Sequence, residues 1–379
     1  MGYAEGYHRL LAVAEPRSRV LPTPPNPADT AIVGVETEIV SDQFNPQLLV
    51  HIHTVDGYTG TGETWWGNYL PNRTPGTPVL PIASVIDELL ASVVIGASPA
   101  EFGDIEMLWH QMVVATHQYG VSGITSIAIS GIDLALWDIV AQRKQVPVHE
   151  VLGPRVHDRI PAYASLTWHN SVDAILADVE RAVAAGFQAV KLHQRTLDGA
   201  RAVRQHFGDD LGIMFDASCR LSEREAYVMG EALADMGVLW LEEPLHAPVD
   251  RLRLAGLRSA VRIPIAAGEN SFTADEFDLL MAGGAVDLVQ PDLVKAGGLT
   301  AGRTIADLAA SYGISVCPHN FSLGPSLWAN IHWGFTIPGV TWLEVPWLPE
   351  GGTFPTDYPM PAIIDGAIMP PTKPGLSAG

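Results

Sequence analysis

Seven positions in the second half of the chain carry ionisable side chains at a nearly constant spacing. Each ends a short apolar run, and successive positions lie 23 to 27 residues apart. They are Lys191 (with His193 two residues later), Asp216, Glu242, Glu269, Asp292, His319 and Glu344. Carboxylates, imidazoles and amines are the groups that bind hard metal ions and move protons. The regular spacing therefore indicates that a repeated structural unit brings these groups to one site.

The three consecutive acids of this series are candidate metal ligands. If neighbouring elements bring Asp216, Glu242 and Glu269 together, the carboxylates repel one another and partly protonate. A divalent cation relieves that repulsion, and a set of oxygen ligands favours Mg²⁺, with Mn²⁺ as the alternative ion. The competing interpretation is that they are solvent-exposed acids or partners of basic residues.

Basic groups stand on both sides of these acids. Asp292 beside His319 would fix the tautomer of the imidazole and make it a general base or acid. Lys191 and His193 would face the same side of one strand, and a nearby cation or base would lower the pKa of the lysine. Structural hydrogen-bonded or ion pairs are the alternative for these residues. The whole set suits removal of a proton next to a carboxylate, with a metal stabilising the enediolate, and a protonated Glu344 could hydrogen-bond that carboxylate.

The elements that must position these residues are visible as short apolar runs that alternate with amphipathic stretches. Eight runs have the pattern of strands: 160–166, 188–193, 211–217, 238–243, 263–269, 286–292, 313–319 and 340–345. The helical pattern between them is weakest over 320–339, which is rich in glycine, proline and tryptophan. This alternation predicts a parallel (β/α) barrel over 153–345. Enzymes with this fold hold their chemistry at the carboxyl ends of the strands, where the seven positions fall.

The first part of the chain, 1–152, predicts a separate α+β domain. Strand-like runs at 31–40 and 47–55 come first, and helical patterns fill 81–145. The proline-rich end of the first 30 residues predicts a surface loop or arm. The tail, 346–379, is rich in proline and glycine, and we expect it to pack back on this first domain.

Composition limits the partners and the compartment. The 379 residues include 22 Lys and Arg against 42 Asp and Glu, a net charge of −20. Nucleic acids and anionic membranes need a surplus of basic residues, so we expect neither as a partner and expect a small carboxylate substrate instead. Only two cysteines, no signal-peptide pattern and no apolar run of membrane length indicate a cytoplasmic protein. We also expect a homo-oligomer.

Several stretches together resemble the enolase superfamily, specifically the mandelate racemase-like group of the mandelate racemase / muconate lactonizing enzyme family. They are QLLVHIHTVDGYTGTGET, GIDLALWDIVAQRKQVPVHEVLG, VKLH, FDAS, LEEP, AGEN, QPDLVKAGG, CPH and PGL, spread over about 32–376. The resemblance implies an α+β capping domain followed by a modified TIM barrel of the (β/α)7β type. It also implies that Asp216, Glu242 and Glu269 bind Mg²⁺, and that Asp292 and His319 form the catalytic dyad.

One position departs from the family pattern. Many racemase-like members carry Lys-x-Lys on the second barrel strand, whereas this chain has Lys191-Leu192-His193. Two different bases, His193 and His319, suit a dehydratase, in which one residue takes the α-proton and the other protonates the departing β-hydroxyl. The resemblance therefore predicts dehydration of a sugar acid (an aldonate or an aldarate) to a 2-keto-3-deoxy acid. The alternatives are a racemase, epimerase or cycloisomerase that uses the same intermediate, and a catalytically silent binding protein on the same fold.

Substrate-binding residues are expected in the loops of the capping domain, at 16–30 and 64–73. The candidates are aromatic and polar: Trp65, Trp66, Asn68, Tyr69 and Arg73, the last as a partner for a carboxylate. Packing between the domains is the alternative for the two tryptophans. Trp168 and His169 follow the first barrel strand and are candidates by position alone.

Two further pairs are interpreted as structural. His51 and His53 alternate on a strand without a third ligand nearby, so we interpret them as residues of a strand face. Cys219 and Cys317 lie close to Asp216 and His319, but no activating partner is apparent, so we interpret both as free thiols.

Overall fold

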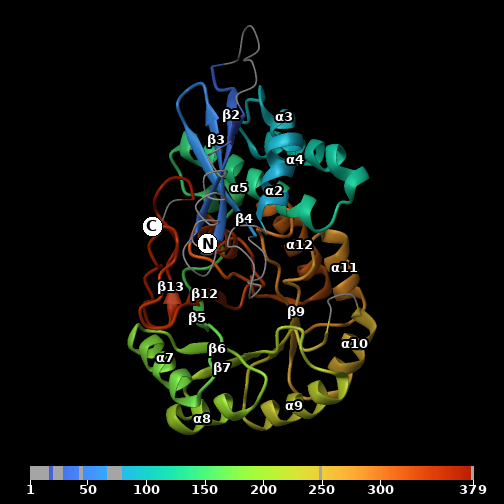
Figure 1. Ribbon diagram of the computed structural model, residues 1–379, viewed down its shortest axis with the longest axis vertical. Coiled ribbons are helices and arrows are strands. Elements are labelled where there is room, and N and C mark those ends of the chain that lie inside the picture. Colours follow the sequence, from blue (N-terminus) through green and yellow to red (C-terminus); the bar gives the residue numbers. More distant parts are fainter. Residues whose placement is uncertain (1–16, 20–28, 42–45, 66–78, 247–249, 377–379) are drawn as a thin grey trace, which may run out of the picture.

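The computed structural model describes residues 17–19, 29–41, 46–65, 79–246 and 250–376. Within these residues a four-stranded antiparallel sheet with its helices packs on a parallel barrel (Figure 1). The expected capping domain and (β/α)7β barrel are therefore confirmed. Trp66, Asn68, Tyr69 and Arg73 lie outside the described residues.

The sheet of the first unit has the strand order β1-β2-β3-β4. Its strands are β1 (Arg17–Arg19), β2 (Ile32–Ser41), β3 (Pro46–Thr54) and β4 (Thr59–Thr64). The helical elements that follow are α2 (Leu80–Val85), η2 (Ile86–Leu90), α3 (Ala91–Val94), α4 (Phe102–Thr116), η3 (His117–Tyr119), α5 (Ile124–Lys144) and α6 (Val148–Leu152). The segment expected to be a loop or arm thus includes a short strand, because β1 adds to the free edge of β2.

Helix α5 is the central element of this unit. Among the described residues it is the one helix with the length and hydropathy of a membrane span, and 94% of its apolar window is buried inside the protein. It lies directly against β4, where a Cβ added to Gly62 would be 2.0 Å from the carbonyl oxygen of Gly131. A Cβ on Gly60 would likewise be 2.1 Å from the carbonyl oxygen of Ala135. The glycines of the TGTGET segment are therefore needed for this close backbone contact.

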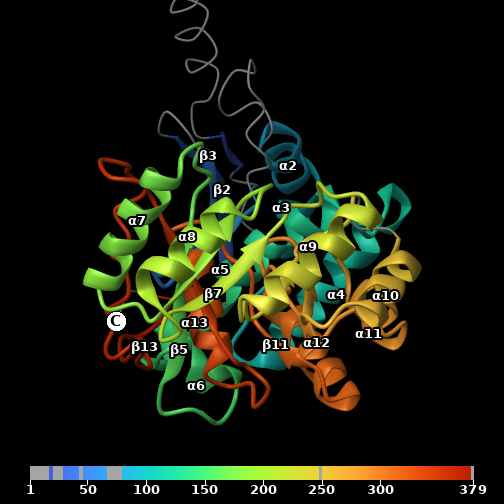
Figure 2. The same ribbon diagram turned by 90° about the horizontal axis from the view of Figure 1, so that it is seen from below.

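Within the described residues, the second unit contains eight parallel strands and seven intervening helices. The strands are β5 (Ile160–Leu166), β6 (Ala189–His193), β7 (Gly212–Asp216), β8 (Leu241–Glu242), β9 (Ile265–Ala267), β10 (Leu288–Val289), β11 (Ser315–Val316) and β12 (Leu343–Trp347). The helices are α7 (Val172–Ala184), α8 (Asp198–Phe207), α9 (Glu223–Asp235), α10 (Arg251–Ala260), α11 (Ala274–Ala282), α12 (Gly298–Tyr312) and α13 (Pro325–Gly334). Neighbouring strands pair in sequence order, β12 pairs with β5, and a bridge between Val316 and Val340 completes the ring. Figure 2 shows several of the helices around the outside of the strands.

Three functional positions lie beyond the strands that were expected to contain them. Glu269 lies two residues past β9, and Asp292 and His319 each lie three residues past β10 and β11. Interstrand hydrogen bonds nevertheless continue in this region, for example from the His319 amide to the Pro291 carbonyl at 3.1 Å. The backbone that carries these residues is therefore fixed although it is not regular strand.

The stretch with the weakest helical pattern forms α13, and all of its residues are buried. Pro325 begins the helix, where its missing N–H costs no hydrogen bond. Because every face of α13 contacts protein, its sequence has no charged side and lacks the pattern of a surface helix.

Aromatic side chains fill the barrel below the carboxyl ends of the strands. The ring of Tyr163 packs edge-on against those of Trp240 (5.7 Å between centroids) and Trp342 (6.5 Å). Cys317 is buried in the same cluster, and the ammonium of Lys191 lies 5.7 Å from the centroid of the Tyr163 ring. Charged groups above this layer are therefore shielded from water on one side.

Buried acids join the first unit to the barrel. Asp133 of α5 accepts hydrogen bonds from the amide (3.1 Å) and hydroxyl (2.5 Å) of Thr300, at the start of α12. Glu63 of β4 accepts one from the amide of Ser326 (3.0 Å), at the start of α13. In both contacts an acidic side chain is placed at the positive end of a helix, although burial raises the pKa of both Asp133 and Glu63.

The C-terminal tail touches both units. Its strand β13 (Ala367–Ile368) pairs antiparallel with β5 of the barrel. Further on, the amide of Leu376 donates to Asp138 of α5 at 2.8 Å. The contact with α5 agrees with the direction expected for the tail, and the pairing with β5 was not foreseen.

Replacing Gly62 with alanine should destabilise the protein by about 2–4 kcal/mol, because the new methyl group would overlap the Gly131 carbonyl and force β4 away from α5. Urea denaturation of Gly62→Ala against the parent protein measures this loss. Gly103→Ala is the matched control, since no heavy atom lies within 4 Å of its added Cβ and alanine favours the helix α4. Equal stability of the two variants would show that the close contact carries no energetic weight.

The ionisation of Asp133 should make stability depend on pH. Burial raises the pKa of Asp133 to about 7 from an ordinary value of 3.8, so the folded state binds its proton more tightly than the unfolded state does. The stability that this proton contributes is complete below about pH 4 and is lost as the pH rises toward 7. Between pH 5 and pH 7 the parent protein should lose about 2 kcal/mol more than Asp133→Asn.

Denaturant unfolding at several pH values measures this difference. Asp209→Asn is the control, because the Asp209 side chain is fully exposed and its removal should leave the pH profile of the parent unchanged. Parallel profiles for Asp133→Asn and the parent would contradict the assignment.

Candidate active site

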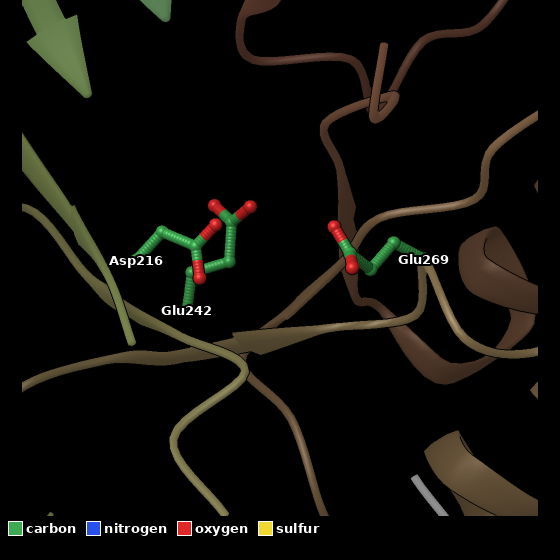
Figure 3. A group of neighbouring side chains, drawn as sticks. All are labelled: Asp216, Glu242 and Glu269. Carbon is green, nitrogen blue, oxygen red and sulfur yellow. The ribbon is translucent and has the colours of Figure 1, made fainter. Parts of the chain in front are cut away.

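Three carboxylates from consecutive barrel strands meet at one point. One oxygen each of Asp216, Glu242 and Glu269 lies within 4.8 Å of the other two. Figure 3 shows Asp216 and Glu242 side by side, with the carboxylate of Glu269 directed toward them from the opposite side. Asp216 and Glu242 are the last residues of β7 and β8 and are paired in register, which explains their common height. Among the described residues, this is the one group of such side chains that could hold a metal ion.

The donor set fits a hard divalent cation. All three side chains offer oxygen, two are buried and Glu269 is half-buried, so a bound ion would keep an open side for water or a substrate. Burial disfavours the charged form of each, but His193 and Lys191 lower the pKa of Asp216, and His319 and Lys295 hold that of Glu269 well below its usual range. Two of the three acids are therefore ionised and ready to bind a cation.

Glu242 is the most firmly held of the three. One of its oxygens accepts a bond from Lys191 (2.5 Å), and the other accepts bonds from the Trp240 indole (2.9 Å) and the Gln290 amide (2.7 Å). Burial nevertheless raises the pKa of Glu242. Its position is thus fixed by three donors before any ion binds.

Lys191 is fully buried between two acids. Its ammonium lies 2.5 Å from Glu242 and 2.6 Å from Glu344. Burial favours the neutral amine, but the charges of Glu242, Glu344 and Asp216 outweigh burial and raise the pKa of Lys191 well above its usual value. The expectation of a lowered pKa is not met, because surrounding carboxylates, and not another base, dominate the field at this amine.

His193, two residues along the same strand, faces the metal-ligand candidates from the rim. Its Nε2 lies 2.9 Å from Asp216, and its Nδ1 lies 2.5 Å from the carbonyl oxygen of Leu166. A carbonyl only accepts, so Nδ1 carries a proton and Nε2 is the atom that can exchange one. Burial lowers the pKa of His193, but Asp216 outweighs it and the net shift is upward.

Asp292 and His319 are in direct contact, as their positions on neighbouring strands suggested. Asp292 lies 2.8 Å from His319 Nδ1 and is itself fixed by the amide of Val294 at 3.0 Å. The other nitrogen, Nε2, lies 2.8 Å from Glu269. Burial favours the neutral imidazole, but Glu269, Glu344 and Asp292 raise the pKa of His319 well above its usual value.

Glu344 belongs to the same cluster but is held as an anion. It pairs with Lys191 and accepts a hydrogen bond from the backbone N–H of Asn320 at 3.0 Å. Burial raises its pKa, but Lys191 and His319 more than compensate and lower it. The protonated form that would donate to a substrate carboxylate is therefore not the form that this environment favours.

Trp65 is the one candidate from the capping loops that lies within the described residues, and it reaches the site. It directly follows β4, and its amide donates to the carbonyl of Val294 at 3.2 Å. Its ring lies 6.1 Å from that of His319, and the Lys295 ammonium lies 4.1 Å from the centroid of the Trp65 ring. One side chain thus both packs between the units and borders the dyad.

Lys295 was missed by the sequence reasoning, although it lies within the motif QPDLVKAGG. It is buried, and its ammonium donates to the carbonyl oxygen of Glu269 at 2.6 Å. Because it lies three residues past Asp292, in a turn, it is out of step with the strand-end spacing that identified the other residues. Its type and its place in the motif were the available signal.

The remaining candidates lie elsewhere. His51 and His53 contact Glu38 and Glu36 across the β2–β3 pair, on the face of the antiparallel sheet. His169 pairs with Asp178 of α7 at 2.6 Å.

The two cysteines are free thiols that resist ionisation. Burial raises the pKa of the Cys219 thiol, and the neighbouring Glu243 raises it further. Burial also raises the pKa of the Cys317 thiol inside the barrel. A thiol that stays protonated is a poor nucleophile. Glu243 itself lies behind the site, where burial raises its pKa to about 7.

An acidic triad flanked by bases at the carboxyl ends of barrel strands, under an α+β cap, defines an enolase-type barrel protein. The mandelate racemase / muconate lactonizing enzyme N-terminal domain family matches residues 22–153, and the family described as enolase C-terminal domain-like matches 174–379. The chain therefore belongs to the mandelate racemase / muconate lactonizing enzyme family of the enolase superfamily.

Individual relatives cover most of the chain. The D-galactonate dehydratase of Xanthomonas campestris pv. campestris is 32% identical over 351 residues, covering 87% of each chain. The D-galactarolactone cycloisomerase of Agrobacterium fabrum is 30% identical over 75% of this chain and 73% of its own. A solved racemase from Streptomyces coelicolor A3(2) with bound magnesium superposes with a TM-score of 0.76, at 26% identity over 96% of this chain and 95% of that one. The relatives thus include both dehydratases and isomerases.

Mg²⁺ should stabilise the folded protein through the acidic triad. At a concentration 100 times the dissociation constant, a ligand that binds only the folded state adds about 2.7 kcal/mol. Asp216→Asn and Glu269→Gln should each remove most of this gain, because each deletes a negative ligand. Thermal denaturation with and without Mg²⁺, together with titration calorimetry, measures the effect.

Glu243→Gln serves as the control for charge and burial. It neutralises a buried acid next to Glu242 that is not part of the triad, so Mg²⁺ binding should persist. Undiminished Mg²⁺ stabilisation of Asp216→Asn and Glu269→Gln would rule out the triad as the metal site.

Proposed function

We propose that this protein is a Mg²⁺-dependent dehydratase that converts a sugar acid into a 2-keto-3-deoxy acid. The observation that carries the proposal is the meeting of three carboxylates between two imidazoles, with His193 on Asp216 and His319 on Glu269. Kinship with the D-galactonate dehydratase supports the substrate class. A cytoplasmic location and assembly into a homo-oligomer are further predictions from the sequence.

Asp216, Glu242 and Glu269 would hold the ion, with Mn²⁺ as the alternative. When bound, the ion supplies Lewis-acid stabilisation of the negative charge that develops on the substrate carboxylate as the α-proton leaves. Lys191 acts beside it as a positioning and charge-balancing residue, because its ammonium is fully buried and engaged with both Glu242 and Glu344. We therefore assign the base on the second barrel strand to His193 and not to Lys191.

His319 is assigned the removal of the α-proton. Asp292 holds the proton on Nδ1, so Nε2 is the atom that faces the reaction. Trp65 borders the same imidazole and excludes water from that side. A cation held by the triad would neutralise Glu269. This would remove the largest charge that raises the pKa of His319 and leave its Nε2 free to accept a proton.

His193 is assigned the protonation of the departing β-hydroxyl. Its Nδ1 is fixed on the Leu166 carbonyl, so the exchangeable proton is on Nε2, which points at the triad. The proton balance closes within the site: His319 gains the α-proton, His193 gives one to the hydroxyl, water leaves, and the enol that remains tautomerises to the 2-keto-3-deoxy acid.

Cycloisomerisation is the second candidate function. The similarity to the D-galactarolactone cycloisomerase favours it, and a cycloisomerisation through the same enediolate would begin with the same proton removal beside a carboxylate. Racemisation would need two bases of matched strength on opposite sides, and the two imidazoles here have different partners. The products therefore separate the candidates.

A screen of sugar acids in D₂O tests the proposed reaction. A dehydratase releases a 2-keto acid, a racemase returns the acid with solvent deuterium and an inverted α-carbon, and a cycloisomerase exchanges an acid with its lactone or cyclic isomer. Turnover of no acid in the presence of Mg²⁺ would favour the silent binding protein. We expect 2-keto acid formation.

The two histidines should fail at different steps. His319→Asn should abolish both deuterium exchange and dehydration, since the α-proton cannot leave. His193→Asn should lower dehydration by about 10²–10⁴-fold while exchange at the α-carbon continues, because only protonation of the hydroxyl is impaired. NMR of the recovered acid after partial reaction reports the exchange. Equal loss of exchange in both variants would contradict this division of roles.

A further inference from the structure

Two arginines flank one exposed tryptophan at the mouth of the barrel. The guanidinium carbons of Arg195 and Arg220 each lie 5.4 Å from the centroid of the Trp168 ring. Trp168 is 40% exposed, and both arginines are exposed as well. We refer to Trp168, Arg195 and Arg220 as the rim cluster.

The rim cluster rises from the strands that carry the site. Trp168 lies two residues past β5, Arg195 two residues past His193, and Arg220 four residues past Asp216. Arg195 therefore lies in the loop that leaves the carboxyl end of the strand carrying His193. Since the carboxyl ends of parallel strands face the same way, the rim cluster lies on the side from which a substrate approaches the triad.

The backbone that carries the rim cluster is anchored. On either side of Arg220, the Cys219 amide donates to the Glu243 carbonyl (2.6 Å) and the Leu221 amide to the Pro244 carbonyl (3.0 Å). Beside Trp168, the carbonyl of His169 accepts from the Gln194 side chain at 3.3 Å, which ties this loop to the residue before Arg195. Arginines on such fixed backbone lose less freedom on binding a ligand than arginines on a mobile loop.

The charges of the rim cluster have no acidic partner in the part of the chain that the structure describes. Acids outnumber basic residues by 42 to 22, and arginines such as Arg143, Arg181 and Arg262 form ion pairs. Among the described residues neither Arg195 nor Arg220 forms an ion pair or a side-chain hydrogen bond, and both guanidinium groups lie near the same aromatic ring. Both guanidinium groups lie 5.4 Å from one ring centroid, so an anion bound beside the ring would gain from the positive charge of both.

We propose that the rim cluster is a binding site for a second anionic group of the substrate, so that the preferred sugar acid is a dicarboxylate (an aldarate). This rests on the proposed function, which places the reacting carboxylate at the ion that the triad would hold. Because that carboxylate already has its partners, the guanidinium groups are available for the far end of the molecule. Arginine binds carboxylates through paired hydrogen bonds, and both charges lie close enough to one ring to act on one anion.

Direct binding to the inactive variant His319→Asn in Mg²⁺ tests the site without turnover. The probes are galactarate, galactonate, and galactonate phosphorylated at its far end, measured by titration calorimetry. Galactarate should bind about 10–100-fold more tightly than galactonate, the usual value of a charge-assisted contact. Adding Arg195→Gln or Arg220→Gln should reduce this advantage about 10-fold or more and leave galactonate binding unchanged.

Arg262→Gln is the matched control, because it removes the same charge from an exposed arginine just before β9, at the opposite end of the barrel. It should keep the full preference for galactarate. Equal binding of the two acids, or a preference that survives the double variant Arg195→Gln/Arg220→Gln, would overturn the proposal. Stronger binding of the phosphorylated acid would overturn the assignment to a carboxylate.

The proposed function can fail separately from this one. If the active protein converts none of the acids but galactarate still binds through the two arginines, the rim cluster stands as an anion site and the assignment as a dehydratase falls. Release of a 2-keto acid from galactonate and galactarate with equal kcat/KM would instead uphold the dehydratase and refute the rim cluster.

Discussion

The crowding of carboxylates inside the barrel is the constraint on which the rest of this structure depends. Four acids from β7, β8, β12 and the end of β9 converge there, and the Asp292 carboxylate lies behind His319. Two lysines, Lys191 and Lys295, and two histidines oppose these five acids, so with all five ionised the cluster stays negative even when both imidazoles are protonated. Such a buried group needs either further positive charge or protonation of an acid, and burial already raises the pKa of Glu242. A divalent cation meets that need.

The rest of the fold can be understood as a support for this charge. The aromatic layer of Tyr163, Trp240 and Trp342 closes the barrel below it and lowers the local dielectric, which strengthens every interaction above. The capping unit closes it from the other side through Trp65, at the end of β4. The close contacts of the β4 glycines with α5 hold that strand in place, and so do the acids at the starts of α12 and α13. The stability of the capping unit and the geometry of the site are therefore linked.

Strand-end spacing was sufficient to predict the barrel and to bring the acids and the dyad together, because a (β/α) repeat sets a constant number of residues between neighbouring strand ends. What lies off that spacing was not predictable in the same way. Lys295 comes from a turn, Gln290 and Trp240 act on Glu242 from positions two residues before Asp292 and Glu242 in the chain, and the rim arginines follow the strand ends. Charge states were also beyond the sequence: the direction of the Lys191 pKa depends on two acids at 2.5 and 2.6 Å, which only the folded chain defines.

The different partners of the two imidazoles give the site a direction. His319 Nδ1 faces a carboxylate, which stabilises the imidazolium and makes its Nε2 the stronger base. His193 Nδ1 faces a neutral carbonyl, which fixes the tautomer but adds no negative charge, so its imidazolium gives up the Nε2 proton more readily. Once the triad's charge is balanced, removal of a proton is easier at His319 and donation is easier at His193. Elimination of water uses that asymmetry, whereas a racemase, which must run equally well from either face, would have to overcome it.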